Sequence, residues 1–275
     1  MLFSRGYGLK NLEYALYVSK PKNLQKYFNE KYRRIYFGNE FCERLIPSQT
    51  KLREVLKFVS RKDLGFTLVT PYVTDFGLKK IESLLKTLAD NFLDCEVVFN
   101  DFGVLRVLRD RYDGLKPIMG RLLVKITRDP RIMNILDILP EKSVEYYRTT
   151  NLTIGCVSEF LRKNRINRVE VDNVLQGLNL NLEVEDLRVS IHTPYIYVTT
   201  TRLCLIGSYG KPNAEIDVRI EPCKKECQRC TFKLENPAMP IPLIRKGNTV
   251  FYINNKQPPT GRNIDRIVFS PEIPI

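Results

Sequence analysis

The sequence predicts an α/β fold: a (β/α) barrel of the TIM-barrel type, complete or partial, followed by a small cysteine-containing, β-rich C-terminal appendage. From residue 12 to about residue 204, short β-rich runs alternate with amphipathic segments, and repeated βα alternation is typical of a parallel sheet. Beyond Leu205 prolines become frequent and the helical pattern stops. We therefore expect a barrel over residues 1–205 and an appendage packed on it over residues 206–275.

The expected elements follow from hydrophobic periodicity. Strands are expected where β-branched and aromatic residues form short runs, and helices where apolar residues recur every three or four positions. The clearest helix places its apolar residues from Leu78 to Phe92 on one face. The expected barrel strands are residues 12–18, 34–37, 66–69, 96–99, 117–119, 168–171 and 195–198; the expected helices are 21–30, 52–59, 78–92, 104–111 and 157–163. In the appendage, residues 215–220, 249–253 and 266–269 are expected to form short strands.

The composition suits a folded chain of this size. Of the 275 residues, 43% are hydrophobic, which excludes a disordered protein. No apolar run approaches the roughly 18 residues that span a bilayer, and charged residues and glycines interrupt residues 1–11 before any signal-peptide core. We therefore expect no membrane span and a cytoplasmic location.

The chain carries a net charge of +13, from 44 Lys and Arg against 31 Asp and Glu. Such a surplus favours an anionic partner, either RNA or an anionic small molecule. The basic residues are spread along the whole length, however, so a solvated basic surface is the alternative interpretation.

Polar residues follow the expected strands at residues 38–42, 70–72, 100–103, 120–121, 172–173 and 199–202. In a parallel barrel these exits lie on one face, where barrel enzymes place their active sites. A single exit could equally be an ordinary helix N-cap. The candidate substrate-binding residues at these exits are Asn39, Glu40, Tyr72, Asn100, Asp101, Arg121, Asp172 and Asn173.

Arg121 is the most informative of these candidates, because Lys125, Arg128 and Arg131 follow it closely. Such a cationic group would suit a ligand that carries carboxylate or phosphate. The alternative is that these cations pair with nearby carboxylates and hold the loops in place.

Three of the seven cysteines form a C-x3-C-x2-C pattern at Cys223, Cys227 and Cys230. Three thiols within eight polar residues suit a soft metal or an iron–sulfur cluster. Structural zinc is the competing interpretation, with Cys204 as a fourth ligand. Cys42 and Cys204 follow expected strands and would face the appendage, whereas Cys95 and Cys156 are expected to be buried, inert thiols, Cys95 at the opposite end of the barrel.

The same spacing occurs in radical S-adenosylmethionine enzymes, but there it follows the first barrel strand, and here it lies late in the chain. Other segments resemble the peptidase U32 family and its cluster-binding relatives. The resemblance lies in residues 37–42, 67–74, 100–103, 120–131 and 172–174 together with the late cysteines.

This resemblance implies a barrel-like fold and a [4Fe–4S] cluster held by one early and three late cysteines. The early ligand corresponds to Cys42, and the late ones correspond best to Cys204, Cys223 and Cys227, with Cys230 as the alternate ligand. Members of the family are described as collagenase-like peptidases or as oxygen-independent hydroxylation proteins that act on RNA or a small aromatic ring. Some relatives act as paired proteins, which implies a partner protein of the same family.

A peptidase mechanism would have to use His192, the only histidine. One histidine cannot form the His-x-x-x-His pair of a zinc peptidase, although it could serve a Cys–His or Ser–His pair. His192 lies in a strand-like run, where a histidine is usually part of the core. The peptidase mechanism is therefore poorly supported, and of the roles that the resemblance implies we expect the redox or hydroxylation role, with a zinc-stabilised nucleic-acid-binding module as the other alternative.

Overall fold

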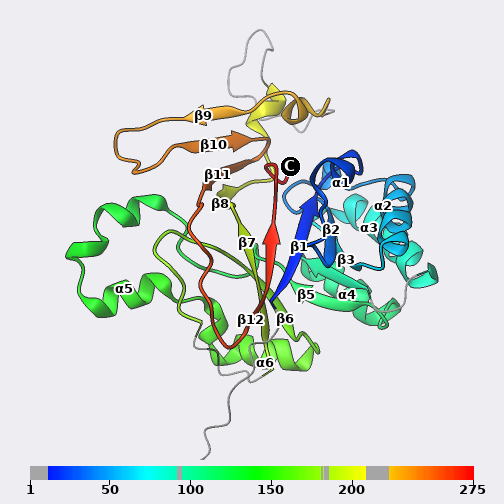
Figure 1. The fold of residues 1–275 in the computed structure, drawn as a ribbon, viewed down its shortest axis with the longest axis horizontal. Helices are drawn as coiled ribbons and strands as arrows, with labels where there is room; N and C mark the ends of the chain where they lie inside the picture. The colour runs from blue at the N-terminus through cyan, green and yellow to red at the C-terminus, as the bar shows by residue number, and fades with distance from the viewer. Residues whose placement is uncertain (1–11, 92–94, 181, 183–185, 209–222) are drawn as a thin grey trace, which may run out of the picture.

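The computed structural model describes residues 12–91, 95–180, 182, 186–208 and 223–275. Within these residues, eight parallel strands close into a barrel in the order β1-β12-β7-β6-β5-β4-β3-β2 (Figure 1). This confirms the predicted (β/α) barrel. Its strands are β1 (Glu13–Val18), β2 (Arg34–Gly38), β3 (Gly65–Val69), β4 (Glu96–Phe99), β5 (Lys116–Met119), β6 (Arg168–Asp172), β7 (Arg188–Thr193) and β12 (Ile264–Phe269).

Helices cover the outside of the barrel, and the main hydrophobic core lies between them and the strands. In α2, for example, Leu52, Val55, Leu56 and Val59 recur at helical spacing and are all buried. No helix among the described residues is both long and apolar enough to cross a membrane. The helices are α1 (Lys22–Tyr27), α2 (Gln49–Arg61), α3 (Asp75–Asn91), α4 (Phe102–Arg111), α5 (Glu141–Arg148) and α6 (Gly155–Lys163).

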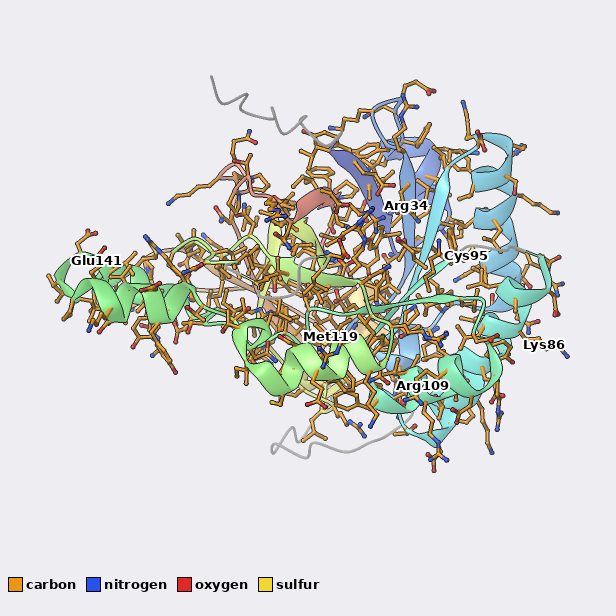
Figure 2. All side chains as sticks on the ribbon, turned by 90° about the horizontal axis from the view of Figure 1, so that it is seen from below. Arg34, Lys86, Cys95, Arg109, Met119 and Glu141 are labelled. Carbon is orange, nitrogen blue, oxygen red and sulfur yellow. The ribbon has the colours of Figure 1, made fainter. Side chains whose placement is uncertain are left out.

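The inside of the barrel combines an apolar cluster with buried polar groups such as Glu170, and it is charged at its amino end. Ala15, Val98 and Val268 belong to the apolar interior cluster. At the amino end, the first residues of several strands form a network of ion pairs. Figure 2 views the molecule from this end and shows Arg34 among the strands and Lys86 at the outer edge of the helix layer.

A four-stranded antiparallel sheet lies over the opposite, carboxyl end of the barrel, toward which the arrowheads of β1 and β12 point (Figure 1). It contains β8 (Tyr195–Thr200), β9 (Phe232–Leu234), β10 (Leu243–Lys246) and β11 (Thr249–Ile253), in the order β8-β11-β10-β9. Because this sheet caps the strand exits, residues of the late segment can meet residues of the barrel mouth.

Two predicted strands do form, but each belongs to the other of the two sheets. Residues 195–198, expected to be the last barrel strand, belong to β8 of the small sheet, and residues 266–269, expected in the appendage, belong to β12 of the barrel. The barrel closes through β7 and β12 because β12 pairs in parallel with both β1 and β7. The expected strand over residues 215–220 lies outside the described residues.

Candidate functional site

Cys42 lies at the barrel mouth, four residues beyond the end of β2. The turn between them is held by Asn39, whose Oδ1 accepts hydrogen bonds from the backbone N–H groups of Phe41 (3.1 Å) and Cys42 (2.8 Å). Gly38 makes the turn possible: its φ is +138°, and a Cβ there would lie 2.1 Å from the carbonyl oxygen of Val69. The local sequence therefore sets the position of the Cys42 thiol.

The late cysteines reach the same place from two other segments. Cys204 follows β8 and precedes a short 3₁₀ turn. Cys223 and Cys227 lie on the loop that leads into β9; the N–H of Lys225 donates to Cys223 Sγ (3.3 Å), and Gln228 Nε2 donates to Cys227 Sγ (3.6 Å). These contacts orient both thiols of the loop.

Each of the four thiols Cys42, Cys204, Cys223 and Cys227 lies within electrostatic range of the other three. Burial, with a further contribution from the three neighbouring thiols, raises the pKa of Cys42 to about 11, although the N–H of Arg44 opposes the rise. Burial is also the main cause that raises the pKa of Cys204 and of Cys227. Burial therefore favours the protonated thiol at Cys42, Cys204 and Cys227, and a bound cation would favour their thiolate forms.

Within the part of the chain that the structure describes, no three His, Cys, Asp or Glu side chains form a group that could hold a metal ion. The four thiols are neighbours without converging on a single point. Cys230 packs against the same hydrophobic cluster as Cys204 and Cys227. It is not among the main causes of the raised pKa of Cys42, Cys204 or Cys227.

Asn248, which the sequence analysis missed, connects the barrel segment to the late segment. Its Nδ2 donates to the carbonyl oxygen of Phe41 (2.7 Å), to that of Thr201 (2.5 Å) and to Tyr72 Oη (3.1 Å). One amide thus holds the residue before Cys42 beside the strand end before Cys204. In the sequence, Asn248 follows Gly247 and resembles an ordinary hairpin turn residue, so no local signal distinguishes it.

An aromatic cluster supports the thiols from below. Phe41 has no exposed surface and packs against Tyr197 and Phe251, with ring centroids 5.5 Å and 5.2 Å away. Cys227 belongs to this cluster and is 6% exposed. A low-polarity surround of this kind strengthens electrostatic effects at the thiols and keeps water away from them.

Comparison with known proteins adds one structural likeness. No protein-family model and no curated protein sequence matches the chain. A solved structure described as "The Structure of the U32 Peptidase Mk0906" aligns with 99% of this chain and 96% of its own chain, at 11% sequence identity and a TM-score of 0.45. The barrel of the present protein is established by its own strand pairing.

Arg121, Glu40 and Asp172 meet below the mouth, in the buried interior. Arg121 Nε donates to Glu40 Oε2 (2.8 Å) and Nη1 to Asp172 Oδ1 (2.6 Å), and none of the three side chains has exposed surface. Burial alone would raise the pKa of Asp172, but Arg121 and Arg128 lower it below its usual range. At Arg121 the structure therefore matches the second interpretation given in the sequence analysis, in which the cations pair with nearby carboxylates.

The two other arginines of this segment differ from each other. Arg128 Nε donates to Asp172 Oδ2 (2.7 Å), and its Nη2 donates to the carbonyl oxygens of Arg121 and Val124. Arg131 pairs with Asp129 on the surface. Only Arg128 therefore takes part in the buried network.

The remaining candidate substrate-binding residues make hydrogen bonds within the protein. Asn100 Nδ2 donates to the carbonyl of Thr70 (2.9 Å), and Asn173 Nδ2 donates to that of Lys256 (2.8 Å). Asp101 accepts from the N–H of Gly103 and so caps α4. Tyr72 Oη donates to the carbonyl of Thr201 (2.7 Å) and lies near enough to Cys42 to interact with it electrostatically.

His192 lies inside the barrel and is 2% exposed. Its Nε2 bonds to Glu170, and its ring meets those of Tyr17 and Tyr36 edge to face. The expectation that it is a core histidine is consistent with this burial.

The two cysteines expected to be inert differ in burial. Cys95 is 5% exposed and directly precedes β4, at the amino end of the barrel from which Figure 2 is viewed. Cys156 is exposed, so the expectation that it is buried is wrong. It is the second residue of α6, whose only buried residue is Leu161, so Cys156 lies on the solvent side.

Proposed function

We propose that this chain binds a [4Fe–4S] cluster through Cys42, Cys204, Cys223 and Cys227 and that it performs or assists an oxygen-independent hydroxylation or related redox step on RNA or a small aromatic substrate. The observation that carries the proposal is the proximity of these four thiols, which come from three separate segments, at the barrel mouth. The sequence resemblance described above supports the same ligand set.

The donor set fits a cluster better than a single zinc ion. A [4Fe–4S] cluster binds each thiolate to a different iron, so its four ligands stand further apart than the ligands of one zinc ion. The four thiols lie within electrostatic range of one another. Together with the sequence resemblance, four thiols from three segments support a cluster as the group that they hold.

When bound, such a cluster supplies one-electron chemistry. The residues of the chain supply the surround. Phe41, Tyr197 and Phe251 form an apolar layer beside the thiols. Asn39 Oδ1 accepts a hydrogen bond from the N–H of Cys42, and Gln228 Nε2 donates one to Cys227 Sγ. Hydrogen bonds to sulfur and low solvent exposure are the features by which a protein sets the reduction potential of a cluster.

The peptidase alternative finds no favourable geometry at His192. A general base must reach the peptide that it acts on, whereas this ring is enclosed by Tyr17, Tyr36 and Glu170. The redox proposal is therefore preferred. Hydrolysis of a peptide panel that is abolished by His192→Ala would contradict this choice.

Anaerobic reconstitution tests the proposal. The protein should be brown and bind about four irons per chain. Cys42→Ala, Cys204→Ala, Cys223→Ala and Cys227→Ala should each lose the iron and its visible absorption, because each removes one of the four neighbouring thiols. Cys95→Ala and Cys156→Ala should retain both, and Cys230→Ala is the matched control within the late loop.

Two results would overturn the proposal. Colourless protein with stoichiometric zinc would show a structural metal site. Full iron in Cys42→Ala together with iron loss in Cys230→Ala would show that the metal is held by the late segment alone.

A further inference from the structure

A cavity of about 410 Å³ lies beside the thiol group, between the start of α2 and the cysteine loop. It shares three residues with the surroundings of the thiols: Asn39, which positions Cys42, and Lys225 and Gln228, which donate to Cys223 and Cys227. Its volume lies in the range of small-molecule sites. A ligand in it would therefore lie next to the thiols.

Four lysines line this cavity, and they come from four different segments: Lys20, Lys51, Lys80 and Lys225. No Asp or Glu side chain is among the residues that line it. Within the described part of the chain, none of these lysines forms an ion pair with a carboxylate. The side chains that line the cavity therefore carry an excess of positive charge, although Glu272 lies within electrostatic range of Lys20.

The amino end of α2 adds to this charge. The helix has 13 residues, begins after the N-cap Ser48 and has no acidic residue in its first turn. Ser48 and Gln49 both line the cavity. The free N–H groups and the positive end of the helix dipole thus stand at the wall of the cavity without a negative side chain nearby in the helix.

The buried amide of Asn39 gives an independent indication of a ligand. Asn39 is 1% exposed, and its Oδ1 is fully engaged with the N–H groups of Phe41 and Cys42. Its Nδ2 has no hydrogen-bond partner, although the residue lines the cavity. A buried donor without an acceptor is unfavourable, which indicates an acceptor beside Asn39 that the described residues do not supply.

We infer that this cavity binds the phosphate group of a small phosphorylated compound. Four ammonium groups, a helix amino end and one amide donor match the double charge and the several acceptor oxygens of phosphate better than the single charge of a carboxylate. The inference does not depend on the iron–sulfur proposal, because all of these groups are present with or without metal.

Calorimetric titration of the full chain with inorganic pyrophosphate at low ionic strength tests this site. Lys20→Gln and Lys51→Gln should each weaken binding about 10-fold, since each removes one of the four positive charges. Lys57→Gln, on the same helix as Lys51 but outside the cavity, is the matched control and should bind as the parent does. Asn39→Asp should abolish binding, because it retains the acceptor for the Cys42 turn and replaces the free donor with a negative charge.

Equal weakening by Lys20→Gln, Lys51→Gln and Lys57→Gln would show a diffuse charge effect and overturn the site. So would binding of single-stranded RNA with no binding of pyrophosphate. The surface lysine variants keep the test decisive if Asn39→Asp does not fold. Iron content, measured on the same preparations, separates failure of this inference from failure of the cluster proposal.

Discussion

Arg121 shows how a residue that resembles a ligand-binding group can be part of the interior. It lies between Glu40 and Asp172, and Arg128 balances the second carboxylate. Two cations and two anions thus compensate one another inside the barrel. In such a network the removal of one partner leaves a buried charge unpaired, which costs more than the pair contributed.

We therefore predict that Arg121→Ala lowers the free energy of unfolding by about 3–5 kcal/mol. Urea denaturation measures this change. Arg131→Ala, which removes only the exposed pair with Asp129, should leave the unfolding midpoint nearly unchanged. An unchanged midpoint in Arg121→Ala together with weaker binding of an anion would instead support the ligand-binding role.

At the scale of the elements, Asp101 at the exit of β4 both begins a helix and holds a neighbouring loop. Asp101 begins α4 with a hydrogen bond from the N–H of Gly103 (2.7 Å) and also accepts from the N–H of Val73 (3.1 Å) in the neighbouring exit. The residue therefore both caps a helix and ties two loops together.

Asp101→Ala should lower the free energy of unfolding by about 1–2 kcal/mol, because it removes the cap and the loop contact. Asp101→Asn retains a capping oxygen and should lose less. Thermal unfolding of the two variants measures the order. A stability unchanged in both would mean that Asp101 does not act as a cap.

The amino ends of the strands form a second network. Glu96 accepts from Arg266 (2.7 and 3.0 Å) and pairs with Arg34 (3.2 Å). Burial by itself would raise the pKa of Glu96, but Arg266, Arg34 and Arg168 lower it from 4.5 to about 2. The carboxylate is therefore favoured in the folded protein.

Because the folded pKa is lower than the unfolded one, the contribution of Glu96 is complete above about pH 4.5 and is lost as the pH falls toward 2. A shift of this size corresponds to roughly 3 kcal/mol at most. Urea denaturation of Glu96→Gln should show a large loss of stability at pH 7 and a much smaller one at pH 2.5. Glu235→Gln, on the surface, should match the parent at both values, and a pH-independent loss in Glu96→Gln would contradict the linkage.

At the scale of the whole molecule, the barrel depends on the last strand of the chain. β12 pairs with β1, the first strand, and with β7, and it follows the whole small sheet in sequence. The barrel and the small sheet are therefore interleaved in sequence. The chain passes from the barrel strand β7 into the small sheet at β8 and comes back to the barrel only at β12.

A chain that ends at residue 205 should fail to fold, because β1 and β7 would have no partner on one side. Far-UV circular dichroism and urea denaturation should show no cooperative transition. In the full chain, Val268→Asp should have the same effect, because Val268 lies in the barrel interior. Ile253 is 41% exposed, so Ile253→Asp should be tolerated. A cooperative transition in the shortened chain would show that residues 1–205 form an independent domain.

The sequence by itself determined the class of fold and most of its elements, because periodic burial is a local property. The apolar stripe of α2 and the β-rich run of β3 are readable without knowledge of their partners. The crowded late cysteines predict a thiol site, because a short polar loop can present several thiolates to one centre, and that site stays a prediction. Only the tertiary structure decided that β12 closes the barrel, that Arg121 is neutralised in the interior and that Asn248 joins Phe41 to Thr201. These outcomes depend on which distant segments pack together, and a local sequence pattern cannot identify a partner that lies 47 or 207 residues away.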